Sequence, residues 1–108
     1  MGELKVLKVD TKPSNYGGVF HYIYFKQLKD GKSARTCVQN TNGNYRRWDK
    51  IVQMAEDGTL GDYDVIVKGA IFRNKSLVDA DSDIRIQITP KQNEFPLEFG
   101  DWRDYGED

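Results

Sequence analysis

The chain contains one stretch, residues 19–26, whose sequence V-F-H-Y-I-Y-F-K leaves few structures open to it. This density of β-branched and aromatic residues is typical of a β-strand, in which side chains alternate between two faces. One face is predicted to hold Val19, His21, Ile23 and Phe25, and the other Phe20, Tyr22, Tyr24 and Lys26. The first set suits a protein core. The second, with three aromatic rings and a cation, suits either packing beneath a helix or a platform on which unstacked bases lie.

Asp30 and Gly31 follow this strand, and an Asp-Gly pair is a strong signal for a tight β-hairpin turn. The return strand is predicted at residues 33–40. Alternation places Ala34, Thr36 and Val38 on one face, and Ser33, Arg35, Cys37 and Gln39 on the other.

Asn44 is a good helix N-cap, and Gly58 is a natural helix stop. Between them, apolar residues recur at helical spacing, which predicts one amphipathic helix. This stripe consists of Tyr45, Trp48, Ile51, Val52 and Ala55. Tyr45 to Trp48, read Y-R-R-W, could form a basic aromatic patch for nucleic acid. The spacing favours instead that both aromatic side chains belong to the core, with Arg46 and Arg47 in solvent.

Three further strands are predicted at residues 4–9, 63–73 and 84–89, and a loop with Pro13, Gly17 and Gly18 is predicted at residues 12–18. The segment 63–73 would place Val65, Val67 and Ile71 on one face, and Ile66, Lys68, Ala70 and Phe72 on the other. Gly69 is a candidate position for a β-bulge within it.

Charge is divided unevenly along the chain. Residues 1–91 hold 15 cations and 11 acids, a net charge of +4, whereas residues 92–108 hold one cation and six acids, a net charge of −5. Such asymmetry often accompanies a body that binds a polyanion. The division predicts a folded domain at residues 1–91 and a flexible acidic tail at 92–108. The tail is richer in aromatic residues than a purely solvating segment, so a role in docking partner proteins or in folding back on the basic face is predicted.

Several classes of chemistry lack the residues they need. Cys37 is the sole cysteine and His21 the sole histidine, which indicates a reducing compartment and no zinc site. The acidic stretch at residues 79–83 resembles the start of a calcium loop. It fails as one, because Ile84 and Pro90 stand where glycine and glutamate are required. We predict no enzymatic activity, no cofactor, no metal, no secretory signal and no membrane span.

The predicted order strand, strand, strand, helix, strand, strand is that of an OB-fold, a five-stranded Greek-key barrel. In OB-folds, nucleic acid crosses the second and third strands, which here include the aromatic stretch at residues 19–26. In this arrangement, and in its acidic tail, the chain resembles the OB-fold single-stranded-DNA-binding proteins, particularly the compact kind encoded by bacteriophages. It differs from the familiar bacterial members in ending Tyr105-Gly106-Glu107-Asp108, without a terminal Pro-Phe.

The resemblance implies sequence-independent binding of single-stranded DNA in replication, recombination or repair, in the cytoplasm, or in the host cytoplasm for a viral protein. The predicted binding residues are Tyr16, Phe20, Tyr22, Tyr24, Lys26, Arg35, Lys68, Phe72 and Lys75. The predicted partner-binding residues of the tail are Phe95, Phe99, Trp102 and Tyr105. An RNA-binding OB module, a protein–protein adaptor or inhibitor using the aromatic face, an inverted assignment of the strand faces and homo-oligomer formation all stay open on the sequence alone.

Overall fold

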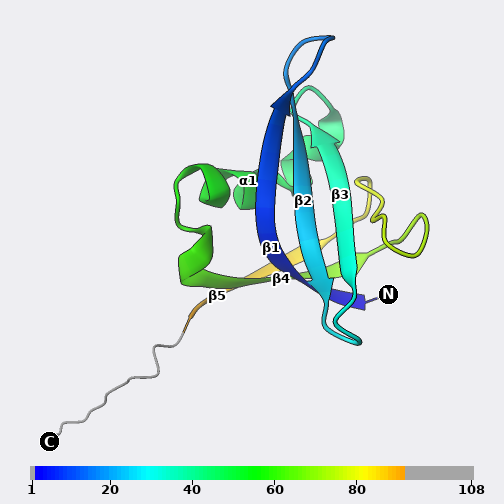
Figure 1. The fold of residues 1–108 in the computed structure, drawn as a ribbon, viewed down its shortest axis with the longest axis vertical. Helices are drawn as coiled ribbons and strands as arrows, with labels where there is room; N and C mark the ends of the chain where they lie inside the picture. The colour runs from blue at the N-terminus through cyan, green and yellow to red at the C-terminus, as the bar shows by residue number, and fades with distance from the viewer. Residues whose placement is uncertain (1, 92–108) are drawn as a thin grey trace, which may run out of the picture.

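In the computed structural model, which describes residues 2–91, β2 (Val19–Gln27) lies between β1 (Gly2–Pro13) and β3 (Ser33–Gln39), antiparallel to both (Figure 1). β4 (Tyr63–Ala70) pairs with the start of β1, and β5 (Arg85–Pro90) pairs with β4. The described strands form one antiparallel sheet in the order β3-β2-β1-β4-β5. The prediction of a mainly β fold with one α-helix is therefore confirmed.

Burial follows the alternation predicted for the central hairpin. The buried side chains of β2 and β3 are His21, Ile23, Phe25, Ala34, Thr36 and Val38. Phe20, Tyr22 and Tyr24 are half-buried, and Lys26 and Arg35 are exposed on the opposite side of the sheet. The predicted assignment of the two strand faces is thus confirmed, and its inversion is wrong.

The turn of this hairpin also forms at the predicted place. The backbone N–H of Gly31 donates to the carbonyl of Gln27 at 2.7 Å, and the N–H of Lys32 donates to the Asp30 carboxylate at 3.0 Å. The aspartate side chain therefore satisfies a backbone donor within the turn that its sequence signal predicts.

β1 is longer than the predicted strand at residues 4–9 and contains an irregularity. Val6 lies opposite Phe25 and Lys8 opposite Tyr24, so Leu7 is an extra residue with no partner of its own on β2. This β-bulge leaves Leu7 54% exposed. Beyond it, pairing continues to Pro13, which takes part of the predicted loop into the strand.

A second bulge corrects the predicted faces of β4. One residue separates Gly2 and Leu4 on β1, but two separate their partners Val67 and Ala70, and one of these two is Gly69, with a φ of +84°. The extra residue shifts the alternation by one. Ala70 is consequently buried and Ile71 is 54% exposed, the reverse of the predicted arrangement.

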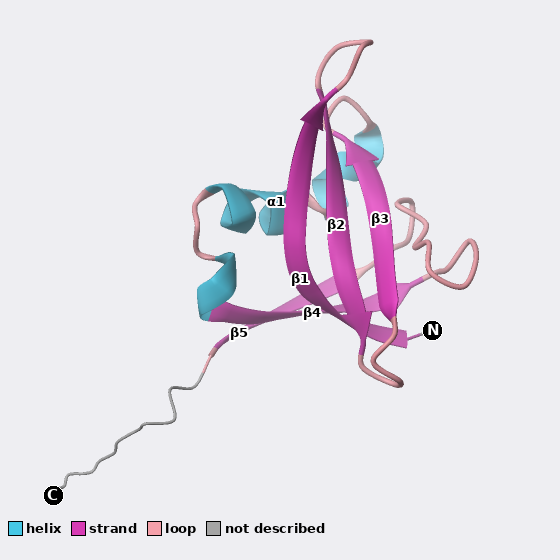
Figure 2. Ribbon diagram, in the orientation of Figure 1, coloured by secondary structure: helices cyan, strands magenta, loops and turns pink. Residues whose placement is uncertain are grey.

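The helical segment is divided into two pieces. A 3₁₀ helix, η1 (Gly43–Arg47), precedes the α-helix α1 (Asp49–Glu56), and a short 3₁₀ turn, η2 (Leu60–Asp62), leads into β4 (Figure 2). The prediction that Asn44 caps the helix is wrong, because its amide donates to the Asp81 carboxylate at 3.0 Å instead. The apolar stripe is nevertheless largely confirmed, since Trp48, Ile51 and Val52 are fully buried.

Trp48 joins this helical segment to the chain before β5. Its ring lies 6.0 Å from that of Phe25, and its Nε1 donates to the carbonyl of Ala80 at 2.8 Å. Because the ring is buried and its indole N–H is hydrogen-bonded, Trp48 is a core residue, as predicted. No helix in residues 2–91 is long and apolar enough to span a membrane.

A short parallel contact links β3 to the segment between β4 and β5. The N–H of Arg35 donates to the carbonyl of Ser76 at 2.9 Å, and the N–H of Val78 donates to the carbonyl of Arg35 at 2.8 Å. The loop that contains Lys75 is thereby held beside β3, next to Arg35.

Candidate nucleic-acid interface

The outer face of the sheet, on the side of β1, β2 and β3 away from the core, consists of three cross-strand rows. From β1 to β3 these rows are Lys12–Phe20–Gln39, Asp10–Tyr22–Cys37 and Lys8–Tyr24–Arg35. Each row places an aromatic side chain in the middle, flanked on both sides by polar or charged groups. Facing side chains in such rows lie about 5 Å apart, so the rings and the flanking groups form one continuous surface.

Two lysines of β1 lie over the central rings. Lys8 Nζ is 5.1 Å from the ring centre of Tyr24, and Lys12 Nζ is 5.7 Å from that of Tyr22. Cation–π contacts at exposed sites contribute only about 0.5–1 kcal/mol each. A phosphate group could therefore draw each ammonium off its ring and leave the ring face for a base.

The centre of the outer face stays uncharged at neutral pH. The neighbouring Cys37 thiol is the main cause that raises the pKa of Tyr22 above its ordinary value. Burial raises the pKa of Cys37, against smaller opposing effects of Tyr22 and Arg35. Both groups remain protonated, so Asp10 is the acid within the three rows, and it lies 3.6 Å from Lys8 Nζ.

An open hollow of about 260 Å³ lies beside Tyr24. Leu7 and Lys8 line it on the β1 side and Ser33 on the β3 side, with Phe25 and Ala34 also contributing. Bulges place two consecutive side chains on nearly the same side of a strand, which explains why Leu7 and Lys8 meet here. The result is an apolar recess next to a ring that could stack a base.

The structure brings most of the predicted binding residues toward this face, and the two exceptions are Phe72 and Lys68. Two of the residues brought toward it lie in loops. Tyr16 is 95% exposed at the tip of the β1–β2 loop, and Lys75 is exposed in the loop beside Arg35. Phe72 does not lie with the others, because it packs against the hydrophobic core. Lys68 lies on β4, where its Nζ is 3.8 Å from the Glu3 carboxylate.

Sequence reasoning did not assign Leu7, Lys8, Lys12 or Cys37 to the site. Extending the first strand to Pro13 would have placed Lys8 and Lys12 on one face by simple alternation. The outward position of Leu7 depends on a bulge for which the sequence carries no glycine or other signal. Alternation does place Cys37 on the correct face of β3, but it does not reveal that this thiol lies next to Tyr22.

His21 lies under the outer face, within the core. It is 1% exposed, its Nδ1 is hydrogen-bonded to the Thr11 hydroxyl at 2.8 Å, and its ring is 5.6 Å from that of Tyr45. Burial lowers its pKa, with a smaller opposing effect of Glu56. The predicted interpretation as a strand histidine with a local partner is confirmed.

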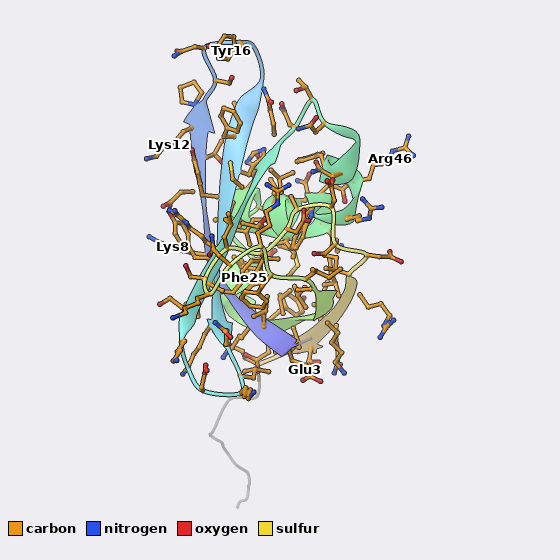
Figure 3. All side chains as sticks on the ribbon, turned by 90° about the vertical axis from the view of Figure 1, so that its right-hand side faces the viewer. Glu3, Lys8, Lys12, Tyr16, Phe25 and Arg46 are labelled. Atoms are coloured by element: carbon orange, nitrogen blue, oxygen red, sulfur yellow. The ribbon has the colours of Figure 1, made fainter. Side chains whose placement is uncertain are left out.

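The basic residues that follow Tyr45 lie apart from the outer face. Figure 3 shows Lys8 and Lys12 on one side of the molecule and Arg46 on the other, so the basic pair after Tyr45 does not extend the aromatic rows. Among residues 2–91, no group of three or more histidine, cysteine or acidic side chains could hold a metal ion.

The predicted docking residues of the tail lie outside the described residues. The outer face thus combines aromatic rings, exposed cations and an apolar recess, a combination suited to nucleic acid with unstacked bases. Comparison of the chain with protein-family models, curated protein sequences and solved structures gave no match.

Proposed function

We propose that this protein binds single-stranded DNA on the outer face, largely independently of sequence, in replication, recombination or repair. The observation that carries the proposal is the set of cross-strand rows in which Tyr22 and Tyr24 are flanked by Lys8, Lys12 and Arg35. Stacking on aromatic rings tolerates every base, and cations along the same track neutralise phosphates.

We also propose that the sheet belongs to an OB-fold barrel. The meander of β1, β2 and β3, the helix before β4, and the pairing of β4 with both β1 and β5 support this. Closing such a sheet requires β3 to approach the chain near β5. The parallel contact of Arg35 with Leu77 lies at this place.

Single strands fit this surface better than duplex. The half-buried rings belong to the face of a continuous sheet, and the bases of a duplex are stacked on one another and cannot reach them. RNA shares the unstacked bases, so RNA binding is the second arm of the test. The tail is proposed to recruit replication or recombination proteins, on the basis of its charge and aromatic residues alone.

The test is a fluorescence titration of the full chain with single-stranded DNA, duplex DNA and single-stranded RNA of equal length, each at several salt concentrations. We expect the tightest binding to a single strand, with affinity falling as salt rises. Equal affinity for duplex and single strand, or no binding at low salt, would contradict the proposal and favour a protein-binding role for the aromatic face.

A further inference from the structure

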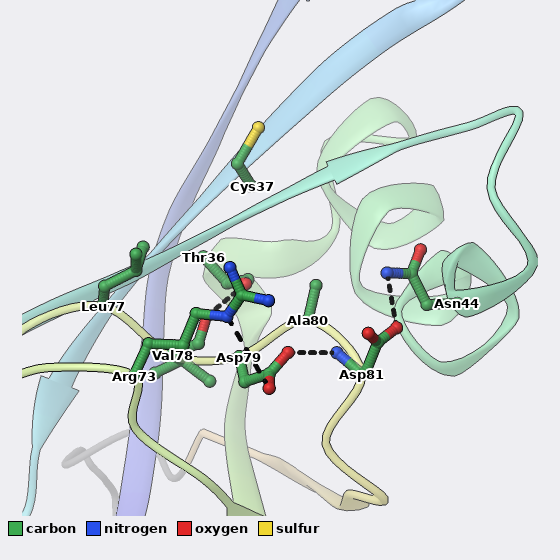
Figure 4. Close-up of a pocket in the computed structure, with 9 residues that line it drawn as sticks. All are labelled: Thr36, Cys37, Asn44, Arg73, Leu77, Val78, Asp79, Ala80 and Asp81. Carbon is green, nitrogen blue, oxygen red and sulfur yellow. Dashed lines mark hydrogen bonds and ion pairs between the residues drawn. The ribbon is translucent and has the colours of Figure 1, made fainter.

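A second hollow opens along the edge of β3, where the parallel contact with the 76–78 segment ends. The carbonyl of Val78 accepts from the Thr36 hydroxyl at 2.9 Å, and the N–H of Asp79 donates to the carbonyl of Ile71 at 2.7 Å. The first bond holds Val78 against β3, and the second draws the chain at Asp79 toward Ile71, just after the end of β4. The resulting space, about 250 Å³, is the wedge, and Figure 4 shows its lining residues.

The backbone of Cys37 borders the wedge without a pairing partner. Backbone groups along a strand point to alternate sides, so Cys37 shares the outward direction of Arg35, two residues earlier. Arg35 uses its N–H and C=O to bind Ser76 and Val78. Within residues 2–91, no backbone group pairs with Cys37 on that side. A donor and an acceptor therefore stand side by side at the mouth of the wedge.

The opposite wall is rich in acceptors. One oxygen of Asp81 accepts from the Asn44 amide at 3.0 Å, which orients the carboxylate and leaves its second oxygen for another donor. Asp79 accepts from the N–H of Asp81 at 3.0 Å, and its other oxygen lies 3.7 Å from Arg73 Nε. The amide oxygen of Asn44 is the buried side-chain oxygen that lacks a partner in the described part of the chain.

The wedge is continuous with the outer face through Cys37. Its side chain lies in the same cross-strand row as Tyr22, and it also lines the wedge. Adjacent strands are about 4.8 Å apart, so a strand of nucleic acid whose base stacks on Tyr22 needs only a short step to place a base edge here. Arg73, which is exposed and also lines the wedge, is a cation that could meet a phosphate on exchanging its ion pair with Asp79.

We infer that the wedge is a base-reading subsite for cytosine or adenine, an inference that rests on the proposed function. These bases present an amino donor beside a ring-nitrogen acceptor. The amino group can donate to the Cys37 carbonyl and the Asp81 carboxylate, and the ring nitrogen can accept from the Cys37 N–H. Thymine presents carbonyl oxygens on either side of its N–H, and these would face the carboxylate wall. The subsite adds a modest base preference to binding that is otherwise independent of sequence.

The experiment compares the affinities of full-length protein for oligo(dC) and oligo(dT) of equal length. We expect oligo(dC) to bind about tenfold more tightly, within the range of discrimination by a paired set of base contacts. Asp81→Asn should bring the ratio of the two affinities close to one. Asp83→Asn is the matched control, because Asp83 is exposed in the same loop but does not line the wedge. It removes the same charge and should preserve the ratio.

Alkylation of Cys37 provides a second readout that needs no substitution, since it is the only cysteine and is exposed. At equal occupancy, oligo(dC) should slow its reaction with a maleimide more than oligo(dT) does. Equal affinity for the two oligomers, or an equal fall of the ratio in both aspartate variants, would overturn the subsite alone. Failure of both oligomers to bind would overturn the proposed function and the subsite with it.

Discussion

Tyr24 combines two contacts that determine how the outer face can work. Lys8 Nζ lies above its ring, and Arg35 lies opposite it on β3. In the unbound protein the lysine lies over the ring, whereas in the complex that we propose the ring stacks a base and the cations meet phosphates. We therefore expect the two kinds of side chain to make separable contributions to binding.

Substitution of the ring should change affinity but not its salt dependence. We expect Tyr24→Ala to cost ~1–3 kcal/mol of single-strand binding, and Tyr24→Phe to cost little, because stacking needs only the ring. The measurement is a series of titrations at increasing salt. A changed salt slope with unchanged affinity would contradict the stacking role, and circular dichroism checks that the variant is folded.

Substitution of a cation should change the salt dependence of the affinity. Arg35→Ala is expected to reduce the slope of log affinity against log salt by about 0.7 for each phosphate of a single strand that the protein no longer neutralises. Lys50→Ala on α1, an exposed cation outside the three rows, is the control and should leave the slope unchanged. Equal effects of the two variants would show that general charge, and not the outer face, governs binding.

Protonation of His21 should couple pH to stability. Burial lowers its folded-state pKa below the ordinary value of about 6.5, so the unfolded chain takes up a proton more readily than the folded protein. The contribution of neutral His21 to the free energy of unfolding is therefore complete above pH 6.5. It is lost as the pH falls through this value toward the lowered pKa of the folded state.

Chemical denaturation at pH 7.5 and at steps down to pH 5.5 measures this effect. The free energy of unfolding should fall over this interval, and should fall less in His21→Gln. Because the chain has one histidine, its single imidazole resonance reports the same pKa directly. A resonance that titrates at or above 6.5 would contradict the prediction.

At the scale of elements, the two bulges decide which side chains reach solvent. Leu7 is turned outward beside Tyr24, and Gly69 moves Ala70 into the core and Ile71 out of it. Gly69 is also confined by its surroundings, since a Cβ at this position would lie 3.1 Å from the carbonyl of Asp83. Gly58, after α1, has a similar φ of +76° but an open environment.

These two glycines form a matched pair for a stability test. Gly58→Ala should cost roughly 1–2 kcal/mol, the strain of a left-handed alanine. Gly69→Ala carries the same strain and must also displace the backbone at Asp83, so it should cost more. Urea unfolding measures both. Equal destabilisation of the two variants would mean that the bulge has room for a side chain.

The predictable part of this fold is the part dominated by local alternation. The hairpin of β2 and β3, its Asp-Gly turn and the burial of Trp48 all follow from spacing and turn chemistry. The errors arise where a single extra residue shifts the inward–outward alternation of side chains along a strand. The bulge at Gly69 reverses Ala70 and Ile71, and it precedes Phe72, which strict alternation would assign to the binding surface. Pairing with β2, which no local pattern reports, extends β1 and brings Lys12 onto the outer face.

At the scale of the whole molecule, the charge of the body opposes that of residues 92–108. The net charges of +4 and −5 mean that the tail should be attracted to the cations that we propose to meet phosphate. A tethered competitor acts at high effective concentration, and salt screens the attraction. Phe95, Phe99 and Trp102 could occupy the ring positions otherwise taken by bases.

Removal of residues 92–108 should therefore tighten single-strand binding, most clearly below physiological salt, and abolish any contact with partner proteins. Paired titrations of the full chain and of a protein ending at Lys91 measure the effect, with circular dichroism as the control for folding. Equal or weaker binding by a well-folded truncated protein at every salt would show that the tail does not compete.

Nuclear magnetic resonance of isotopically labelled full-length protein can locate bound DNA on the proposed interface. Titration with a single-stranded oligomer of mixed sequence should shift the backbone amides of Lys8, Tyr22, Tyr24, Arg35 and Cys37 most strongly. The exposed residues Lys50 and Gln53 of α1, on a different element, should stay unchanged. The largest changes on α1 and β5, with the three rows unaffected at saturation, would show that DNA does not bind on the outer face.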